Sequence, residues 1–258
     1  MNSELSHKIY FASDLHLGVP DLSNSRKREL KFVAWLDNAV LEGATEIHLL
    51  GDLFDFWFEY SHVIPKGGVR LLGTIAKITD LGIPVHYHVG NHDLWSFGYL
   101  ESELGVTLHR TPIIKEWDGL KCLIGHGDGL GPGEIGYKVT KKFYQSKIPQ
   151  FIFHCLHPDL GIRLANRLSR NSRAAGGKSG GEFISSSNEN LFKYCQDRLS
   201  IDPSINCFIF GHRHIPLDLE LTKLESQNTA SRYINTGDWI THFSSAKLID
   251  GKLTLLKG

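Results

Sequence analysis

Five short apolar runs in this chain each stop on a segment rich in aspartate, histidine and asparagine, and this repeated pattern restricts the folds that the chain can adopt. One run, residues 47–50, reads as a short buried strand and stops on Gly51-Asp52. In open α/β sheets, ligands collect at the carboxyl ends of the strands. The pattern therefore predicts an α/β protein in which several strand ends contribute to one polar site.

The other four runs precede motifs of the same kind. Residues 10–13 precede Asp14 and His16, residues 85–89 precede Gly90-Asn91-His92-Asp93, residues 121–124 precede Gly125-His126-Gly127-Asp128, and residues 207–210 precede Gly211-His212-Arg213-His214. Each motif alone is common in turns. Their joint occurrence, each after an apolar run, favours a functional site over an accidental set of turns.

The spacing of apolar residues predicts alternating strands and helices in the first third of the chain. Strands are expected at 8–13, 46–50 and 84–89, with helices at 25–42 and 69–81, the first of them ending before Gly43. This alternation implies parallel strand pairing through right-handed crossovers.

Beyond residue 105 the pattern changes to short strands with little helix between several of them. They are expected at 106–109, 112–117, 120–125, 206–210, 231–235 and 246–256, and the last contains an Asp250-Gly251 hairpin turn. We therefore predict an α/β fold in which two sheets form a β-sandwich flanked by helices.

Residues 135–199 differ from the rest and are predicted to form a helical insertion, or lid, above the site. The core would then comprise residues 1–134 and 200–258. The insertion is rich in phenylalanine and leucine, and between residues 138 and 178 it carries nine basic residues against one acidic residue. Because the whole chain has 28 basic and 28 acidic residues, the neutral total conceals this basic segment.

Composition adds expectations about location. The four cysteines are widely spaced, which is typical of reduced thiols in the cytosol. The first residues lack an apolar segment, so we expect no secretory signal, and no apolar run reaches the length of a membrane-spanning helix. Attachment to a membrane surface remains compatible with this composition.

Seven side chains at the five strand ends are of types that bind metal ions. They are Asp14, His16, Asp52, Asn91, His126, His212 and His214. Seven ligands exceed one closed tetrahedral site and suit two ions that share the Asp52 carboxylate. Paired ions recur in phosphoester hydrolysis. Mixed oxygen and nitrogen ligands suit Mn²⁺, which we take as the first choice, or Fe or Zn.

The five motifs together resemble the signature of the calcineurin-like metallophosphoesterases. The resemblance implies a two-sheet sandwich, one metal ion on Asp14, His16, Asp52 and His214, and a second on Asp52, Asn91, His126 and His212. It also implies that His92 acts on the leaving group as a donor or general acid, oriented by Asp93. The catalytic residues would be His92, Asp52 and Asn91.

Finer features are similar to those of the metallophosphoesterase subfamily that hydrolyses UDP-2,3-diacylglucosamine in lipid A biosynthesis. They are residues 51–57, the tyrosine after residues 126–128, and residues 170–172 with a later lysine. This resemblance implies that the insertion covers the site and holds an acyl chain. It implies substrate contacts by Asn91, His92, Glu134, Tyr137, Arg170, Ser172, Lys178 and His212. Many subfamily members carry arginine at the position of His92, which is a departure in this chain.

The resemblance implies hydrolysis of this lipid-linked UDP-sugar to UMP and 2,3-diacylglucosamine 1-phosphate by a metal-activated water, peripherally on the cytoplasmic face of the membrane. One alternative is a nucleotide or general phosphodiesterase of the same fold, and another is a binding scaffold with an inactive metal site. No nucleic acid partner is expected, because outside the insertion no extended basic groove with interleaved aromatic residues is evident. No obligate protein partner is evident from the sequence either.

Seven further histidines are expected to be packed or partly solvated and not to bind metal. They are His48, His86, His88, His109, His154, His157 and His242. The segment 235–240 has no role that the sequence suggests.

Overall fold

The first three strands alternate with helices as the sequence predicts. The computed structural model describes residues 7–133, 135–175, 185, 189–221 and 230–258. In order come β1 (Lys8–Ala12), α1 (Leu22–Leu41), β2 (Glu46–Leu49), α2 (Val69–Asp80) and β3 (Val85–His88). The three strands pair in parallel. Asp21 caps α1 by accepting a hydrogen bond from the Asn24 N–H, and Gly43 follows the helix in the left-handed conformation.

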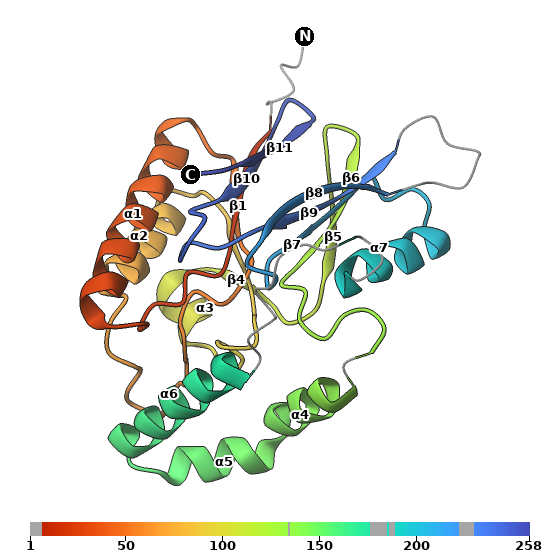
Figure 1. Ribbon diagram of the computed structural model, residues 1–258. Coiled ribbons are helices and arrows are strands. Elements are labelled where there is room, and N and C mark those ends of the chain that lie inside the picture. The colour runs from red at the N-terminus through yellow and green to blue at the C-terminus, as the bar shows by residue number, and fades with distance from the viewer. Residues whose placement is uncertain (1–6, 134, 176–184, 186–188, 222–229) are drawn as a thin grey trace.

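Two mixed sheets form the core, which confirms the predicted α/β sandwich (Figure 1). The first has the order β11-β10-β1-β2-β3-β4 and the second β5-β6-β7-β9-β8. The remaining strands are β4 (Thr107–His109), β5 (Ile113–Trp117), β6 (Leu120–Gly125), β7 (Cys207–Phe210), β8 (Pro216–Leu221), β9 (Ser231–Thr236), β10 (Ser245–Ile249) and β11 (Lys252–Leu256).

Strand β1 shows how the layers are held together. Ile9 and Phe11 point into the core between the two sheets, whereas Tyr10 and Ala12 pack in the core beneath α1 and α2. Successive residues of a strand point to opposite faces, so a strand covered on both sides reads as one continuous apolar run. This explains why the run that precedes Asp14 has no polar residue in alternation.

Two elements were not predicted, and one predicted turn is present. The six-residue helix α3 (Tyr99–Leu104) ends at Gly105, and β8 lies at the edge of the second sheet with Asp218 exposed. Asp250 and Gly251 both have positive φ and join β10 to β11, as the Asp-Gly pair predicts.

Helices α4 (Ile135–Gln145), α5 (Lys147–Cys155) and α6 (Pro158–Ala175) lie together at one end of the sandwich (Figure 1). Phe153 and Ala165 of these helices pack with Phe58 and Trp95 of the core. The Trp95 indole N–H donates to the carbonyl of Tyr144 at 2.8 Å. We call α4–α6 the lid.

The expected lid boundary at residue 199 is wrong. Helix α7 (Asn190–Ile201) belongs to the core, because Leu191, Phe192 and Cys195 pack against Phe208 of the second sheet. Like the lid helices, α7 has both apolar and polar residues, and it follows them in the chain. The sequence alone therefore did not distinguish α7 from the lid. We propose that the insertion be drawn as 135–175.

Among the described residues, none of the helices combines the length and the apolar character needed to cross a membrane.

Candidate metal centre

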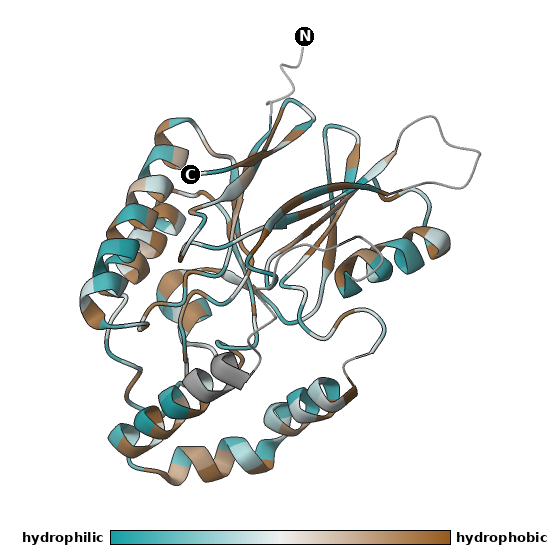
Figure 2. Ribbon diagram, in the orientation of Figure 1, coloured by the Kyte–Doolittle hydropathy of each residue, from teal (hydrophilic) through white to brown (hydrophobic). Residues whose placement is uncertain are grey.

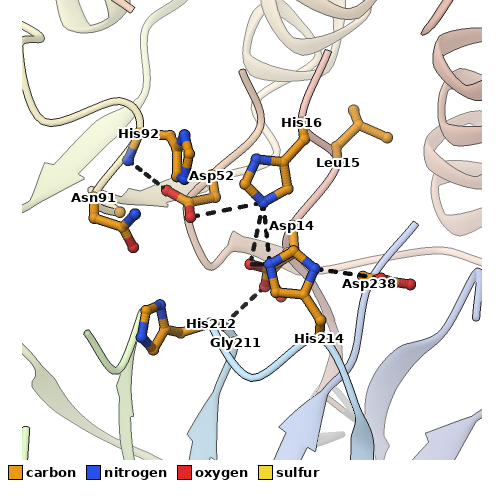
Figure 3. A network of polar contacts seen from close by, with 12 residues as sticks. Asp14, Leu15, His16, Asp52, Asn91, His92, Gly211, His212, His214 and Asp238 are labelled. Atoms are coloured by element: carbon orange, nitrogen blue, oxygen red, sulfur yellow. Dashed lines mark hydrogen bonds and ion pairs between the residues drawn. The ribbon is translucent and has the colours of Figure 1, made fainter. Parts of the chain in front are cut away.

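Main-chain hydrogen bonds join the polar end of β1 to that of β2, and the polar end of β6 to that of β7. The Asp14 N–H donates to the carbonyl of Gly51 at 3.0 Å, and the Gly211 N–H donates to the carbonyl of His126 at 2.9 Å. The His16 N–H donates to the carbonyl of Asp52 at 2.9 Å. The main-chain N–H of His212 donates to Asp14 Oδ2 at 2.8 Å and so joins the two sheets, and the side chains of these segments converge there (Figure 3).

The first group of converging side chains is Asp14, His16 and His214. The two Nε2 atoms of the histidines lie 3.2 Å apart, and His214 Nε2 lies 3.3 Å from Asp14 Oδ1. Asp14 Oδ1 is buried and has no hydrogen-bond partner among the described residues. Ring nitrogens and a carboxylate oxygen that face one another in this way are suited to a cation between them.

The second group is Asp52, His126 and His212, whose ligand-type atoms lie within 4.8 Å of one another. His126 Nε2 lies 3.3 Å from Asp52 Oδ2 and 3.3 Å from the side-chain oxygen of Asn91. Asp52 Oδ2 also lies 3.8 Å from His16 Nε2 in the first group. The structure therefore brings all seven expected metal-type side chains together, with the Asp52 carboxylate between the two groups.

Hydrogen bonds on the far side of the rings fix which nitrogen faces the centre. His126 Nδ1 lies 2.6 Å from the carbonyl of Leu50, so this nitrogen carries a proton, and the neutral ring that binds a cation has its lone pair on Nε2. His214 Nδ1 lies 3.3 Å from Asp238 Oδ2, which has the same effect on its Nε2 (Figure 3). Both imidazoles therefore present Nε2 as an acceptor for a cation.

Asp238 is a site residue that the sequence reasoning missed. Its Oδ1 accepts hydrogen bonds from the N–H groups of Thr241 and His242 at 2.9 Å each, so the carboxylate is held in place. The next residue, Trp239, is buried against Phe32. A signal was present, because the predicted strand at 231–235 also stops on a Gly-Asp pair.

Asp93 does not orient His92, contrary to the expectation. The Asp93 carboxylate accepts hydrogen bonds from the Tyr87 hydroxyl at 2.5 Å and from the Gly90 N–H at 2.6 Å, so it braces the loop. His92 Nδ1 instead lies 2.7 Å from the main-chain carbonyl of Asp55. The main-chain N–H of His92 donates to Asp52 Oδ1 at 2.8 Å. The motif still places the His92 ring beside the centre, 4.7 Å from the ring of His16.

The backbone at the centre is held in a conformation that most residues avoid. Eight described residues other than glycine have positive φ, and five of them belong to the two groups. They are Asp14, His16, Asp52, His212 and His214. Such residues persist only where the surroundings enforce them, and they cluster at functional sites. The glycines of the motifs serve close approach, since a Cβ on Gly90 would overlap the Asp52 carboxylate.

Carboxylates dominate the electrostatics of the centre. Burial opposes a charge on His126, but the carboxylate of Asp52 outweighs burial and raises the pKa of this ring to about 10. Burial is outweighed in the same way at His16, where Asp14 and Asp55 raise the pKa to about 9. The centre therefore holds negative charge that protons or a metal ion must balance.

The expected substrate contacts are only partly described by the structure. The Tyr137 hydroxyl donates to Asp128 Oδ2 at 2.6 Å, which places it beside the His126 loop. Arg170 and Ser172 lie in α6, but their side chains lie outside the described part, as do Glu134 and Lys178 altogether. Ser169, one residue before Arg170, donates to Asp55 Oδ2 at 3.2 Å, so α6 reaches the edge of the centre.

The raised pKa values predict how the stability of the metal-free protein depends on pH. The folded-state pKa of His16 and of His126 lies above the ordinary value of about 6.5. Their contribution to the free energy of unfolding is therefore complete below about pH 6.5 and is lost as pH rises through about 9 and 10. Urea unfolding of chelator-treated protein should show this decline.

The matched control is His62→Asn, which removes an exposed histidine and should keep the decline. His126→Asn should flatten it. Addition of a divalent ion should reverse the slope, because metal binding requires neutral imidazoles. Equal pH dependence in the wild-type protein and in His126→Asn would contradict the electrostatic account.

Comparison with known proteins places the chain in a family. No family model matches it. A Porphyromonas gingivalis protein named UDP-2,3-diacylglucosamine hydrolase is 31% identical over 261 residues, which cover 97% of this chain and 97% of that protein. A protein of the same name from Escherichia coli O6:K15:H31 is 28% identical, over 95% of this chain and 97% of its own length. Another from Pseudomonas fluorescens is 25% identical, over 90% of this chain and 87% of its own length.

Among solved structures, a phosphoesterase from E. coli is 15% identical with a TM-score of 0.43, over 96% of this chain and 98% of that chain, which is too distant to add to the assignment. The assignment rests on the similarity to the Porphyromonas protein over nearly the whole of both chains. The chain belongs to the UDP-2,3-diacylglucosamine hydrolase family.

Proposed function

We propose that this protein hydrolyses UDP-2,3-diacylglucosamine to UMP and 2,3-diacylglucosamine 1-phosphate, as a step in lipid A biosynthesis. The observation that carries the proposal is the pair of metal-type groups that share Asp52 beneath an amphipathic lid. Membership of the family supports the choice of substrate. The lid accounts for a substrate that combines a phosphate ester with long acyl chains.

The two groups suit two divalent cations. One would be held by Asp14, His16, Asp52 and His214, and the other by Asp52, Asn91, His126 and His212. The orphaned Asp14 oxygen and the Nε2 atoms fixed as acceptors support this division. When bound, such ions lower the pKa of water and stabilise negative charge on a phosphate. Mn²⁺ fits the mixed donors, with Fe or Zn as alternatives.

His92 is placed to act on the substrate and not on a metal ion. Its Nδ1–H is engaged by the Asp55 carbonyl, which leaves Nε2 as the working atom. Burial lowers the pKa of this ring in the free protein. The negative charge of a bound phosphate favours the protonated ring, which can then donate to the leaving-group oxygen.

The lid supplies apolar surface for the acyl chains. A cavity of about 740 Å³ lies between α5 and the core, and Phe58, Tyr60, Phe97 and Phe151 line it. Burial of an acyl chain there contributes roughly 0.8 kcal/mol per CH₂. We assign this cavity to part of the acyl region.

Apolar side chains on the outside of the lid support peripheral attachment to the cytoplasmic face of the membrane. Figure 2 shows apolar stretches along α5 among polar ones. Apart from Phe151, which lines the cavity, the exposed apolar residues of the lid are Ile135, Val139, Phe143, Tyr144, Ile148, Ile152, Leu160, Leu164 and Leu168. Lys138 and Lys141 of α4 are poorly placed to contact lipid headgroups, because Lys141 pairs with Asp128 at 2.7 Å and Lys138 donates to the carbonyl of Gly131.

The direct test is product analysis by mass spectrometry after incubation with UDP-2,3-diacylglucosamine and Mn²⁺. We expect UMP and the diacylated sugar 1-phosphate in equal amounts. Asp52→Ala should lose both bound metal, measured by elemental analysis, and turnover, because Asp52 lies between the two groups. Turnover of small soluble phosphodiesters in place of this substrate would favour a general phosphodiesterase.

A second prediction separates catalysis from metal binding at His92. His92→Ala should keep its metal content and lower kcat by roughly 10²–10⁴ if the ring is a general acid. Elemental analysis and steady-state kinetics on the same preparation measure both quantities. Metal content that falls in step with kcat would assign His92 to the ligands instead.

A third prediction uses two phenylalanines of α5 that differ in exposure. Phe151 is exposed and lines the cavity, whereas Phe153 is buried and attaches the lid to the core. Phe151→Ser should therefore raise KM for the diacylated substrate and leave KM for a short soluble nucleotide ester unchanged. Phe153→Ser should impair both substrates, because it loosens the lid. Equal effects of Phe151→Ser on both substrates would exclude an acyl contact.

A further inference from the structure

A second cavity lies beside the centre and shares no lining residue with the cavity assigned to the acyl region. Its volume is about 350 Å³, which is within the range of small-molecule sites. His88 and His109 at the ends of β3 and β4 form one wall, and Lys138 and Lys142 of α4 form another. His126 also lines it, so the cavity opens on the candidate metal centre. We call it the α4 cavity.

Basic side chains dominate the α4 cavity. Arg110, Lys138, Lys141 and Lys142 line it with one acidic residue, Asp128. Lys141 neutralises Asp128 at 2.7 Å. Lys142 is exposed and forms no ion pair within the described ranges, and it lies four residues after Lys138 on the same face of α4. The cavity therefore favours an anionic group near its α4 wall.

On the wall that His88 lines, hydrogen bonds from Glu46 through His48 to His88 fix which ring nitrogens carry protons. His48 Nε2 lies 2.9 Å from Glu46 Oε1, and because a carboxylate accepts, this nitrogen carries the proton. Burial lowers the pKa of His48 to about 4, so the ring is neutral and its Nδ1 is an acceptor. His88 Nε2, 3.0 Å from that Nδ1, must then donate.

It follows that His88 Nδ1 carries a lone pair. This ring is also neutral, because burial lowers its pKa. His88 is 1% exposed, and its Nδ1 has no hydrogen-bond partner in the described part of the chain. A buried acceptor without a partner is an energetic cost to the folded protein. A ligand that brings an N–H or O–H group into the cavity would remove this cost.

Glu46 and the histidines could be taken for a third metal group, since Glu46, His48 and His86 lie close together. The Glu46 carboxylate is already balanced, because Lys115 Nζ lies 2.9 Å from Oε1 and the Trp117 indole donates to Oε2 at 3.2 Å. The rings of His48 and His86 are also stacked, at 16° and 4.6 Å, which is unsuited to a shared ion in both ring planes. The hydrogen bonds from Glu46 through His48 to His88 are better explained by their effect, which is to fix the tautomer of His88.

The two walls together select one kind of ligand. A hydrogen phosphate ion carries one O–H group but leaves most of a cavity of about 350 Å³ empty. An acyl chain satisfies neither wall. A nucleoside monophosphate has both an anionic phosphate and N–H or O–H donors on its base and sugar.

We propose that the α4 cavity binds the nucleoside monophosphate half of the substrate, with its phosphate toward Lys142 and His126 and its nucleoside toward His88. This assignment rests on the proposed function and adds a subsite to it. The acyl region and the nucleotide then occupy separate cavities, and the scissile phosphate lies between them.

The test is calorimetric titration of UMP into the metal-loaded protein, with inorganic phosphate and 2,3-diacylglucosamine 1-phosphate as comparison ligands. Lys142→Ala should weaken UMP binding roughly tenfold, since a charge-assisted contact is lost. The matched control is Lys147→Ala, an exposed lysine of the next helix outside the α4 cavity, which should bind UMP as the wild type does.

His88→Leu should weaken UMP binding and leave phosphate binding unchanged, because only the nucleoside meets this ring. The assignment is overturned if Lys142→Ala binds UMP normally, or if it weakens the diacylated sugar phosphate and spares UMP. Lys142 is on the surface, so its substitution tests the assignment even if His88→Leu does not fold. UMP binding is measured without turnover, so failure of the proposed function would appear separately, as an absence of products from the wild type.

Discussion

The Asp52 carboxylate is the interaction on which the rest of the site depends. Its Oδ1 accepts the His92 N–H at 2.8 Å, and its Oδ2 faces His126 at 3.3 Å and His16 at 3.8 Å. One buried charge thus joins side chains from both sheets. Burying it is costly unless opposite charge is near, which explains the raised pKa values of the surrounding imidazoles and the suitability of the centre for cations.

The lid is attached to the residues that support this centre and not to the centre itself. Ser169 of α6 bonds Asp55, whose main-chain carbonyl holds the His92 ring. Tyr137 and Lys141 of α4 bond Asp128, two residues from His126. A movement of α6 would therefore displace Asp55, which holds His92, and a movement of α4 would displace Asp128, which lies beside His126. Because α4 also lines the α4 cavity, a ligand bound there would contact the helix that holds Asp128.

The buried histidines of β2, β3 and β4 illustrate how polar groups are accommodated between the layers. Glu46 at the start of β2 receives donors from His48, Lys115 and Trp117, so its charge is paired. Paired strands place His48 and His86 side by side in register. The network leaves one acceptor without a partner among the described residues, Nδ1 of His88, and this residue lines the α4 cavity. Polar residues in a core are tolerated when each is bonded, and an exception indicates a ligand.

The sequence by itself determined the two-sheet fold and the convergence of seven metal-type side chains, because apolar runs and their polar ends are local patterns and parallel strands end at one edge. It did not determine which atoms support those side chains. Asp238, distant in sequence, reaches His214, and Asp93 braces a loop instead of orienting His92. It also could not separate α7 from the lid, since both are amphipathic. Only tertiary packing decides which face meets which neighbour, and the tautomer of His88 depends on contacts across three strands.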